Sequence, residues 1–307
     1  METKVSKVSN IIARRRSVLA RLGQAAGDAP LRVFCSGIGG TGLSGLARLV
    51  SDLGHDVWGS DRSPSPLSQS LEGSGVRVTY SQEADNVRDV DLFVATAALP
   101  HNHPELVAAK TLGIPVVKYA EALGSLVAAR TGVALAGTHG KTTTTSMLAT
   151  ILRGCGRDPS WIVGGRPCDL PCSAAIGKDP EIVFEACEFD RSFRHYAPNV
   201  AVILNVEADH LDCYPGGLDE IVEAFTGFGV QLPKGGTLIV SADWPAAVRV
   251  AERVQSARPD VRVDTFSLEG AGRVCATRIE TTRGLPHFRL VIGGADHGEV
   301  QLAVPGL

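Results

Sequence analysis

The segment GTHGKTT, residues Gly137 to Thr143, constrains the fold of this chain more than any other stretch of its sequence. It follows a short apolar run, Thr131–Ala136, and precedes apolar residues at helical spacing as far as about Leu152. Glycines allow backbone N–H groups to converge on an anion, Lys141 adds positive charge for the outer phosphates, and the hydroxyl of Thr142 suits Mg²⁺. Two glycines, a lysine and a hydroxyl residue at this spacing arise by chance only about 0.01 times in such a chain. The segment therefore predicts a nucleotide-phosphate loop that joins a strand to a helix.

This predicted loop differs from the usual phosphate loop in its length. It is shorter than G-x-x-x-x-G-K-[ST], because Leu135 stands where the outer glycine would be. The alternative interpretation is a polar helix cap formed by the threonines. We expect nucleotide phosphates to contact the following residues: Gly137, Thr138, His139, Gly140, Lys141, Thr142 and Thr143.

A second glycine motif lies nearer the start of the chain. Residues 37–42, GIGGTG, match G-x-G-x-x-G after the strand pattern Leu31–Cys35 and before the helical pattern Leu43–Leu53. The motif alone arises by chance about 0.4 times in a chain so rich in glycine, so its position between a strand and a helix carries the argument. It predicts a diphosphate site, with Asp61 accepting from ribose hydroxyls or, alternatively, lying solvated in a turn. The candidate residues are Gly37, Ile38, Gly39, Gly40, Thr41, Gly42 and Asp61.

Strand patterns alternate with helical patterns along most of the chain. A length of 307 residues, at about 150 per domain, predicts roughly two domains, and the alternation predicts parallel sheets with helical crossovers. We expect an α/β protein with a helical extension outside the core at residues 1–30, a Rossmann-like domain at 31–125 and a phosphate-loop mononucleotide-binding α/β domain at 126–307. The boundary should lie near residues 120–131. After about residue 260, apolar alternation punctuated by glycine predicts antiparallel strands.

Composition and charge exclude several classes of protein. A formal net charge of −3 gives no electrostatic reason to expect a nucleic-acid partner. No apolar run approaches the roughly 18 residues that a membrane span needs, and the N-terminal segment lacks the apolar centre of a signal peptide. Seven cysteines, an odd number, fit reduced thiols better than a disulfide framework. These features predict a cytoplasmic protein.

Two acidic clusters follow strand patterns of the second predicted domain. Residues 184–190, FEACEFD, end the pattern Ile182–Glu185, and residues 205–212, NVEADHLD, follow the pattern Val200–Leu204. Open α/β sheets bind ligands at the carboxyl ends of their strands. Carboxylates supply oxygen ligands for Mg²⁺, and a histidine can complete the metal's ligands or position phosphate. One such cluster is more often a solvated loop, whereas two beside a phosphate loop predict a site for Mg²⁺ and ATP.

Four strings in this order and separation, GIGGTGLSGLA, GTHGKTTTT, FEACEFDRSF and NVEADHLDCY, resemble those of the Mur ligase family. The resemblance covers about residues 31–307. It implies an ADP-forming ligase in which ATP phosphorylates a carboxylate to an acyl phosphate and an amine then attacks the acyl carbon. For this chain it implies ligation of L-alanine to UDP-N-acetylmuramate in the synthesis of peptidoglycan precursors, with Mg²⁺ as cofactor and ATP as cosubstrate.

The resemblance also implies roles for individual residues. Residues 37–42 and Asp61 would bind the UDP-sugar, residues 137–143 would bind the ATP phosphates, and Asn205 would face the muramoyl group. The implied catalytic residues are Lys141, Glu185 and His210. The implied Mg²⁺ ligands are Thr142, Glu185 and His210.

Two departures from the family pattern alter these expectations. No lysine lies between Lys178 and Lys234, so a carbamylated lysine at the metal is not expected. In the family a sequence like Val304–Gly306 runs into an H-N-x-x-N helix and a third domain, whereas this chain stops at Leu307. We therefore expect the C-terminal ligase domain to be absent, the chain to be an incomplete ligase, and a separate chain carrying that domain to be a candidate partner.

Three other functions stay open at this stage. One is a nucleotide-sugar and ATP-binding module without ligase activity. Another is the family member that recycles muramoyl tripeptide, although its first glycine turn typically differs from GIGGTGLSGLA. A generic phosphate-loop ATPase is the third, and it predicts no affinity for a UDP-sugar.

Overall fold

The computed structural model describes residues 4–304, with side chains from residue 11 onward. Its contacts divide the chain into two compact units. The first consists of the residues up to 132 together with residues 142–185, and the second of residues 133–141 together with those from 186 onward. The domain boundary near residues 120–131 remains a prediction.

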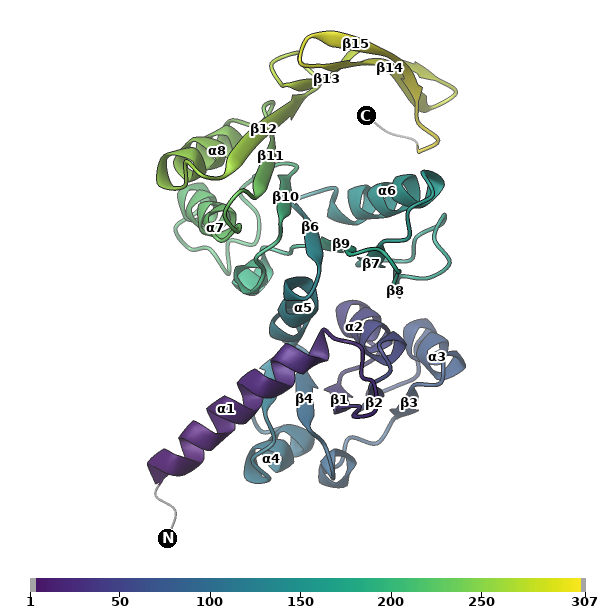
Figure 1. Cartoon of the computed structure of the whole chain (residues 1–307), viewed down its shortest axis with the longest axis vertical. Coiled ribbons are helices and arrows are strands. Elements are labelled where there is room, and N and C mark those ends of the chain that lie inside the picture. Colours follow the sequence, from purple (N-terminus) through teal and green to yellow (C-terminus); the bar gives the residue numbers. More distant parts are fainter. Residues whose placement is uncertain (1–3, 305–307) are drawn as a thin grey trace. The chain divides into compact units, whose positions relative to one another are not determined.

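The first unit contains a five-stranded parallel sheet in the order β3-β2-β1-β4-β5 (Figure 1). In this order the chain reverses direction across the sheet beside β1, as in doubly wound nucleotide-binding folds. The α/β fold class, with a Rossmann-like parallel sheet first, is confirmed. The strands are β1 (Arg32–Ser36), β2 (Asp56–Ser60), β3 (Arg77–Thr79), β4 (Leu92–Ala95) and β5 (Val116–Lys118). The helices are α1 (Lys4–Leu22), α2 (Thr41–Asp52), α3 (Pro66–Gly73), the 3-10 helix η1 (Ala84–Val87), α4 (Pro104–Thr111) and α5 (Tyr119–Ala128).

Burial explains why the central strands of this sheet are almost continuously apolar. All four residues of β4 are buried, and β1 is buried after Arg32. The Phe34 ring lies 5.6 Å from the Phe93 ring and meets Trp58 edge to face. This core fixes the carboxyl ends of β1 and β2, where the first glycine turn and Asp61 emerge.

Helix α1 differs from its prediction as an extension outside the core. Val18 and Leu22 are buried, α1 packs against α5, and the Arg15 guanidinium donates to the Glu121 carboxylate. Residues four apart share one face of a helix, so Val18 and Leu22 are buried together. The expectation is therefore wrong for the last turns of α1.

Residues 142–185 add a helix and three strands to the first unit. Helix α6 (Lys141–Gly154) follows the phosphate loop. Strand β7 (Ser160–Ile162) pairs in parallel with β9 (Glu181–Glu185) and antiparallel with β8 (Ala174–Ala175). The predicted strand at residues 182–185 is present as β9.

The second unit carries a mixed sheet. Five parallel strands lie in the order β13-β12-β11-β10-β6, and β14 and β15 continue from β13 in antiparallel pairing. Antiparallel pairing is confirmed for β13 to β15 and wrong for β12, because helix α8 makes the crossover that returns β12 parallel to β11. The strands are β6 (Thr131–Ala136), β10 (Val200–Ile203), β11 (Thr237–Ser241), β12 (Arg262–Ser267), β13 (Val274–Thr282), β14 (Leu285–Ile292) and β15 (Ala295–Gln301). The helices are the 3-10 helix η2 (Phe189–His195), α7 (Leu218–Val230) and α8 (Pro245–Ala257).

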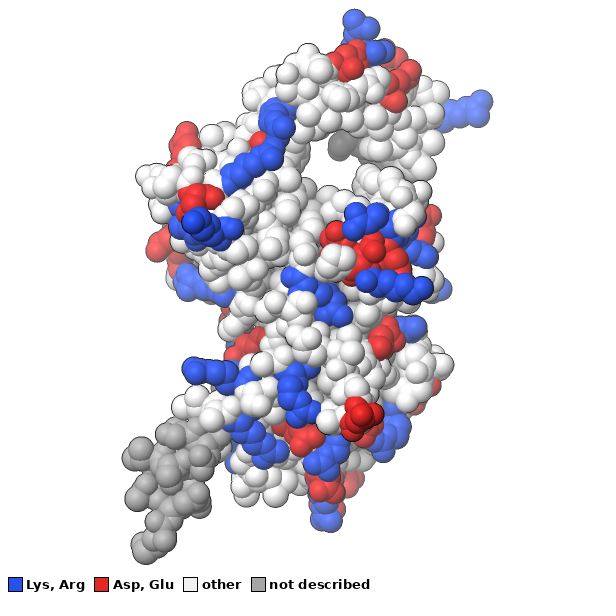
Figure 2. Space-filling view, viewed as in Figure 1, with Lys and Arg blue, Asp and Glu red and all other residues white. Residues whose placement is uncertain are grey.

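Three further features of the chain concern membrane-spanning helices, surface charge and cysteines. None of the helices within residues 4–304 is both long and apolar enough to cross a membrane. On the face shown in Figure 2, Lys and Arg side chains lie among Asp and Glu side chains. All seven cysteines carry free thiols.

Candidate active site

The phosphate loop connects β6 to α6, as the sequence predicts. Gly137 has φ of 140° and Gly140 has φ of 83°, a left-handed region that glycine enters without steric cost. A Cβ atom at Gly137 would lie 3.1 Å from the backbone nitrogen of Asn205. Glycine is therefore required at Gly137 by both its conformation and its close neighbour. Thr142 and Thr143 are exposed on the first turn of α6.

Asn205, which follows β10, is bound to the phosphate loop. Its Oδ1 accepts from the backbone N–H of His139 at 2.8 Å, and its Nδ2 donates to the His139 carbonyl at 3.1 Å. Its own carbonyl accepts from the Thr138 N–H at 3.3 Å. The Asn205 amide thus holds the loop, and its orientation toward a muramoyl group remains a prediction.

A second pair of polar contacts joins the loop to the segment after β10. The Glu207 N–H donates to the Thr138 hydroxyl at 3.0 Å, and the His139 Nε2 lies 3.9 Å from the Glu207 carboxylate. Both His139 and Glu207 have exposed side-chain surface. The ends of β6 and β10 are therefore linked through side chains as well as through the sheet.

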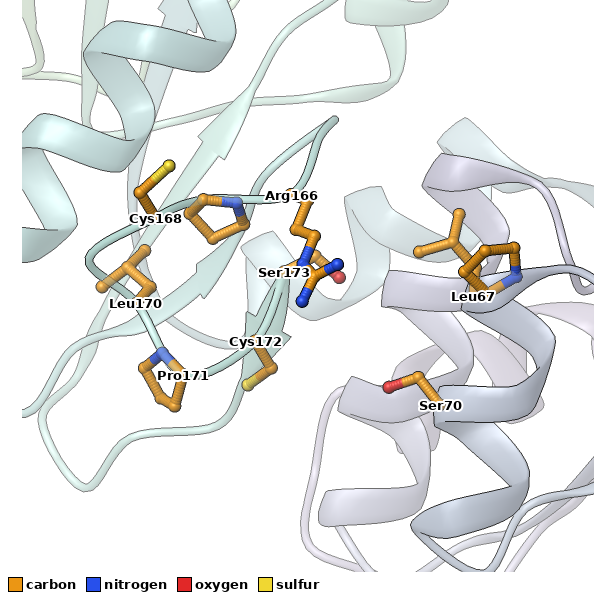
Figure 3. A pocket seen from close by; sticks show the side chains of 10 residues that line it. Leu67, Ser70, Arg166, Cys168, Leu170, Pro171, Cys172 and Ser173 are labelled. Carbon is orange, nitrogen blue, oxygen red and sulfur yellow. The ribbon is translucent and has the colours of Figure 1, made fainter.

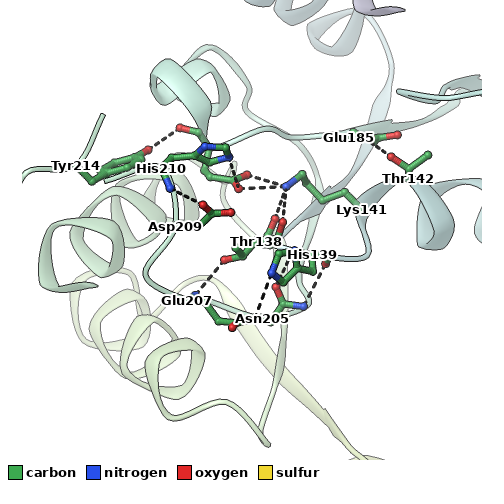
Figure 4. Close-up of polar contacts among 12 residues, drawn as sticks. Thr138, His139, Lys141, Thr142, Glu185, Asn205, Glu207, Asp209, His210 and Tyr214 are labelled. Atoms are coloured by element: carbon green, nitrogen blue, oxygen red, sulfur yellow. Dashed lines mark hydrogen bonds and ion pairs between the residues drawn. The ribbon is translucent and has the colours of Figure 1, made fainter. Parts of the chain in front are cut away.

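Lys141 folds back over the loop and forms a buried ion pair (Figure 4). Its Nζ donates to the carbonyls of Gly137 at 2.5 Å and Thr138 at 3.1 Å, and to the Glu188 carboxylate oxygens at 2.9 and 3.1 Å. The Glu188 side chain is only 3% exposed and that of Lys141 is 15% exposed. A buried carboxylate thus fixes the ammonium group at the mouth of the loop.

The sequence analysis missed Glu188 as a site residue. The only signal was its membership of the acidic cluster at residues 184–190, in which Glu185 was the candidate. The Tyr214 hydroxyl donates to the Glu188 carbonyl at 2.5 Å, so the backbone of Glu188 is held as well as its side chain. Burial raises the pKa of Tyr214 to about 12, so this hydroxyl remains a donor at neutral pH.

His210 also lies beside Glu188. Its Nε2 is 3.9 Å from Glu188 Oε1, and its ring meets Phe189 edge to face. Its backbone has φ of 51°, and its N–H donates to the Asp209 carboxylate at 2.7 Å. Left-handed backbone at a residue other than glycine costs free energy and is common at functional sites.

Thr142 and Glu185 form a separate polar pair. The Thr142 hydroxyl donates to Glu185 Oε2 at 3.1 Å, and the Gly164 N–H donates to Glu185 Oε1. A hydroxyl and a carboxylate are oxygen ligands of the kind that Mg²⁺ prefers. Among the described residues no group of three or more His, Cys, Asp or Glu side chains is arranged to hold a metal. Because Mg²⁺ commonly takes one or two carboxylates and completes its ligands with phosphates and water, Thr142 and Glu185 still fit this ion.

The first glycine turn lies between β1 and α2, and most of its N–H groups have partners inside the protein. Those of Gly37 and Ile38 donate to the Ser60 carbonyl at 2.8 and 3.0 Å, and that of Gly40 donates to the Gly37 carbonyl at 3.1 Å. The Ile38 side chain is fully buried, so only its backbone faces the turn. Thr41 and Gly42 begin α2, where first-turn N–H groups have no acceptor within a helix.

Asp61 is tied to this turn. Its Oδ2 accepts from the Gly39 N–H at 2.7 Å, and its Oδ1 accepts from the Arg62 N–H at 2.7 Å. The glycine turn and the Asp61 carboxylate line one cavity of about 450 Å³, together with His103. The predicted residues are thus brought together, although the carboxylate already has two donors.

A larger cavity of about 640 Å³ lies elsewhere in the first unit (Figure 3). Leu67 and Ser70 of α3 line this cavity together with Arg166, Cys168 and Cys172 of the segment between β7 and β8. None of these five residues was a candidate in the sequence analysis.

A parallel sheet with a glycine turn at its switch point, and a second glycine turn that holds a lysine between a strand and a helix, are features of nucleotide-binding α/β proteins. Residues 34–131 match the Mur ligase family, catalytic domain, and residues 135–307 match the Mur ligase middle domain. The chain therefore belongs to the Mur ligase family.

Individual relatives agree with this assignment. The UDP-N-acetylmuramate--L-alanine ligase of Rubrobacter xylanophilus is 41% identical over 276 residues, and that of Pelobacter propionicus is 38% identical over 279 residues. Each alignment covers 90% of this chain and 59% of the relative, so the chain spans about three fifths of the length of these relatives.

Solved structures resemble the chain as well. The UDP-N-acetylmuramate-alanine ligase of Thermotoga maritima superimposes with a TM-score of 0.77 at 25% identity, over 90% of this chain and 61% of that one. The UDP-N-acetylmuramate:L-alanyl-gamma-D-glutamyl-meso-diaminopimelate ligase of Neisseria meningitides gives a TM-score of 0.78 at 27% identity, over 91% of this chain and 89% of that one.

Proposed function

We propose that the protein to which this chain belongs joins L-alanine to UDP-N-acetylmuramate in an ATP-dependent, ADP-forming reaction of peptidoglycan precursor synthesis. The observation that carries the proposal is the phosphate loop with Lys141 held at its mouth, in a chain of the Mur ligase family. The relatives at 38–41% identity, named as L-alanine ligases, support this choice of amine. A cytoplasmic location, where both nucleotides are available, is part of the proposal.

The proposed chemistry has two steps. A carboxylate oxygen of UDP-N-acetylmuramate takes the γ-phosphoryl group of ATP, which gives an acyl phosphate and ADP. The amine of L-alanine then attacks the acyl carbon, an amide bond forms, and phosphate leaves with the electron pair of the C–O bond. Lys141 stabilises charge on the phosphoryl group during the first step.

Other residues bind and orient the nucleotides. Residues 137–143 hold the ATP phosphates, and Asn205 keeps that loop in its anion-binding conformation through His139. Thr142 and Glu185 would hold Mg²⁺, with His210 as the further candidate, and the ion would neutralise phosphate charge. The first glycine turn and Asp61 bind the UDP moiety at the switch point of the first sheet.

The product of the reaction tests the proposal directly. ADP release and mass detection of the amide are measured with UDP-N-acetylmuramate, ATP, Mg²⁺ and L-alanine, using the protein that carries these residues. We expect product only when all four are present. Product with the tripeptide L-alanyl-γ-D-glutamyl-meso-diaminopimelate in place of L-alanine would favour the second candidate, which the Neisseria structure supports. A rate of ATP hydrolysis that does not depend on the UDP-sugar would indicate a generic ATPase. Binding of both nucleotides without product would indicate an inactive binding module.

Two glycine substitutions test which nucleotide binds at which loop. Gly137→Ala places a Cβ at a residue with φ of 140° and 3.1 Å from Asn205 N, so it should weaken ATP binding about tenfold and leave UDP-N-acetylmuramate binding unchanged. Gly39→Ala places a Cβ 2.8 Å from Asp61 Oδ2, so it should weaken binding of the UDP-sugar and leave ATP binding unchanged. Calorimetry on the 307-residue chain measures both affinities.

The control for this pair is Gly154→Ala. Gly154 ends α6, and a Cβ there has no neighbour within 4 Å. Both affinities should stay at their original values. The opposite pattern, in which Gly39→Ala weakens ATP binding and Gly137→Ala weakens UDP-sugar binding, would reverse the assignment of the nucleotides.

A further inference from the structure

A buried carboxylate lies beneath the first glycine turn. Glu105, in α4, has no exposed surface. Its Oε2 accepts from the hydroxyls of Ser36 at 2.6 Å and Ser60 at 2.8 Å, which end β1 and β2, and its Oε1 accepts from Asn86 Nδ2 at 2.8 Å. All three donors are neutral. Their number and geometry fix the Glu105 carboxylate at the carboxyl edge of the sheet.

His103 brings an imidazole close to this carboxylate. It is the N-cap residue of α4, but its side chain makes no capping hydrogen bond. The residue is 8% exposed, and its Nδ1 is buried without a hydrogen-bond partner, 3.7 Å from Glu105 Oε2. Buried polar atoms are nearly always hydrogen-bonded, so such an atom calls for an explanation.

The same histidine lines the cavity at the glycine turn. That cavity, about 450 Å³, is also lined by Gly37, Gly39, Asp61 and Arg62. The N–H groups of residues 37–40 all donate within the protein, as described above. An anion in the cavity would therefore draw its donors from the start of α2 and from the side chains of Arg62 and His103 in the cavity wall.

We propose that His103 is a binding residue for the diphosphate of the nucleotide sugar and that Glu105 is the positioning residue for its ring. The inference rests on the proposed function, since it deepens the UDP-sugar site. With Nδ1–H directed to Glu105, the imidazole donates from Nε2 to a phosphate oxygen, as histidines oriented by a carboxylate do elsewhere. The Nδ1 atom of His103, which has no hydrogen-bond partner in this structure, gains an acceptor when the ring moves toward the Glu105 carboxylate.

This arrangement gives diphosphate binding a pH dependence. Within the described part of the chain, the charged groups that contact the ring or line the cavity with it are Glu105 on α4 and, after β2, Asp61 and Arg62. The Asp61 carboxylate is held by the N–H groups of Gly39 and Arg62. An anion binds a protonated imidazole more tightly than a neutral one, so the affinity for the UDP-sugar should be higher at about pH 6 than at about pH 8.

The test is the affinity of the 307-residue chain for UDP-N-acetylmuramate, measured by calorimetry at about pH 6 and about pH 8. This ligand is a suitable probe because its diphosphate is a diester and does not titrate in that range. His103→Asn should weaken binding about tenfold at the lower pH and abolish the difference between the two pH values. Asparagine is a favoured N-cap residue, so α4 should remain intact.

The matched control is His101→Asn, two residues away at an exposed position. It should leave the affinity and its pH dependence unchanged. ATP affinity in each variant reports folding at the other nucleotide site. Glu105→Gln should weaken binding of the UDP-sugar more at the lower pH than at the higher pH, whereas a purely structural role for Glu105 would weaken binding equally at both pH values.

A measurement on the unsubstituted chain tests the inference even if one of the variants does not fold. Addition of UDP-N-acetylmuramate near pH 7 should move the imidazole C–H resonances of His103 toward their protonated positions in an NMR spectrum. Unchanged His103 resonances, or His103→Asn binding with the original affinity and pH dependence, would overturn this inference and leave the proposed function intact. A chain that does not bind UDP-N-acetylmuramate at all would overturn the proposed function instead.

Discussion

Lys141→Ala is expected to lower the rate of ADP formation by about 10²- to 10³-fold, because in the proposed mechanism the ammonium group stabilises charge on the transferring phosphoryl group. The structure places Lys141 Nζ against two carbonyls of the phosphate loop and against Glu188, so its position is fixed before ATP arrives. Such preorganisation is what makes one donor worth several kcal/mol in a transition state. Coupled ADP release at saturating substrates measures the effect.

The same substitution should also lower the free energy of unfolding. Glu188 is only 3% exposed, and loss of Lys141 removes its nearest cation. Removing one partner of a buried ion pair costs about 3 kcal/mol or more, and the 15% exposure of Lys141 places this case at the lower end. The double variant Lys141→Ala/Glu188→Gln should regain most of the lost stability and none of the activity. Recovery of turnover in the double variant would remove Lys141 from the mechanism.

Local patterns predicted the elements around the phosphate loop. Strand β6, the loop and α6 are consecutive, and their apolar spacing and glycines are visible in one short segment. Partners distant in sequence could not be predicted in this way. Asn205 holds His139 across 66 positions, and Glu188 pairs with Lys141 across 47. Only the sheet, which brings the segments after β9 and β10 near the loop, creates these contacts.

The first glycine turn also shows that local patterns do not predict contacts between residues distant in sequence. Its sequence correctly predicts a turn between a strand and a helix. It does not reveal that the Asp61 carboxylate accepts a hydrogen bond from the Gly39 N–H. Nor does it single out His103 or Glu105, which lie in a different crossover. A histidine two residues before a glutamate is common in any chain. Burial makes this pair informative, and burial depends on the complete fold.

Helices α5 and α8 were missed for a different reason. Helix α5 lies in the segment that was assigned to a domain boundary, and α8 received no prediction although Pro245 marks its first turn. Helix α5 covers α1, and α8 is the crossover that makes β12 parallel. The prediction of antiparallel pairing rested on glycine-punctuated alternation after about residue 260, and this pattern does not show that β12 follows a helical crossover.

His210→Ala is expected to lower ADP formation by about 10²-fold or more, because it removes an imidazole from the group of side chains around Glu188. The alanine variant also changes a backbone position with φ of 51°, so lost activity alone would not identify the imidazole as the cause. His210→Asn separates the two effects, since asparagine tolerates left-handed backbone better than most residues. We expect the asparagine variant to fold with nearly unchanged stability and still to be inactive.

The control for His210 is His195→Ala, at an exposed position at the end of η2. It should retain full turnover, which excludes a general effect of losing a histidine from this region. The dependence of the rate on Mg²⁺ concentration then distinguishes two roles for His210. A metal ligand should require a higher Mg²⁺ concentration when His210 is replaced, so excess Mg²⁺ should restore part of the activity of His210→Asn. If His210 acts only by positioning Glu188 and Lys141, excess Mg²⁺ should restore none, and full activity in His210→Asn would show that the imidazole takes no part in the reaction.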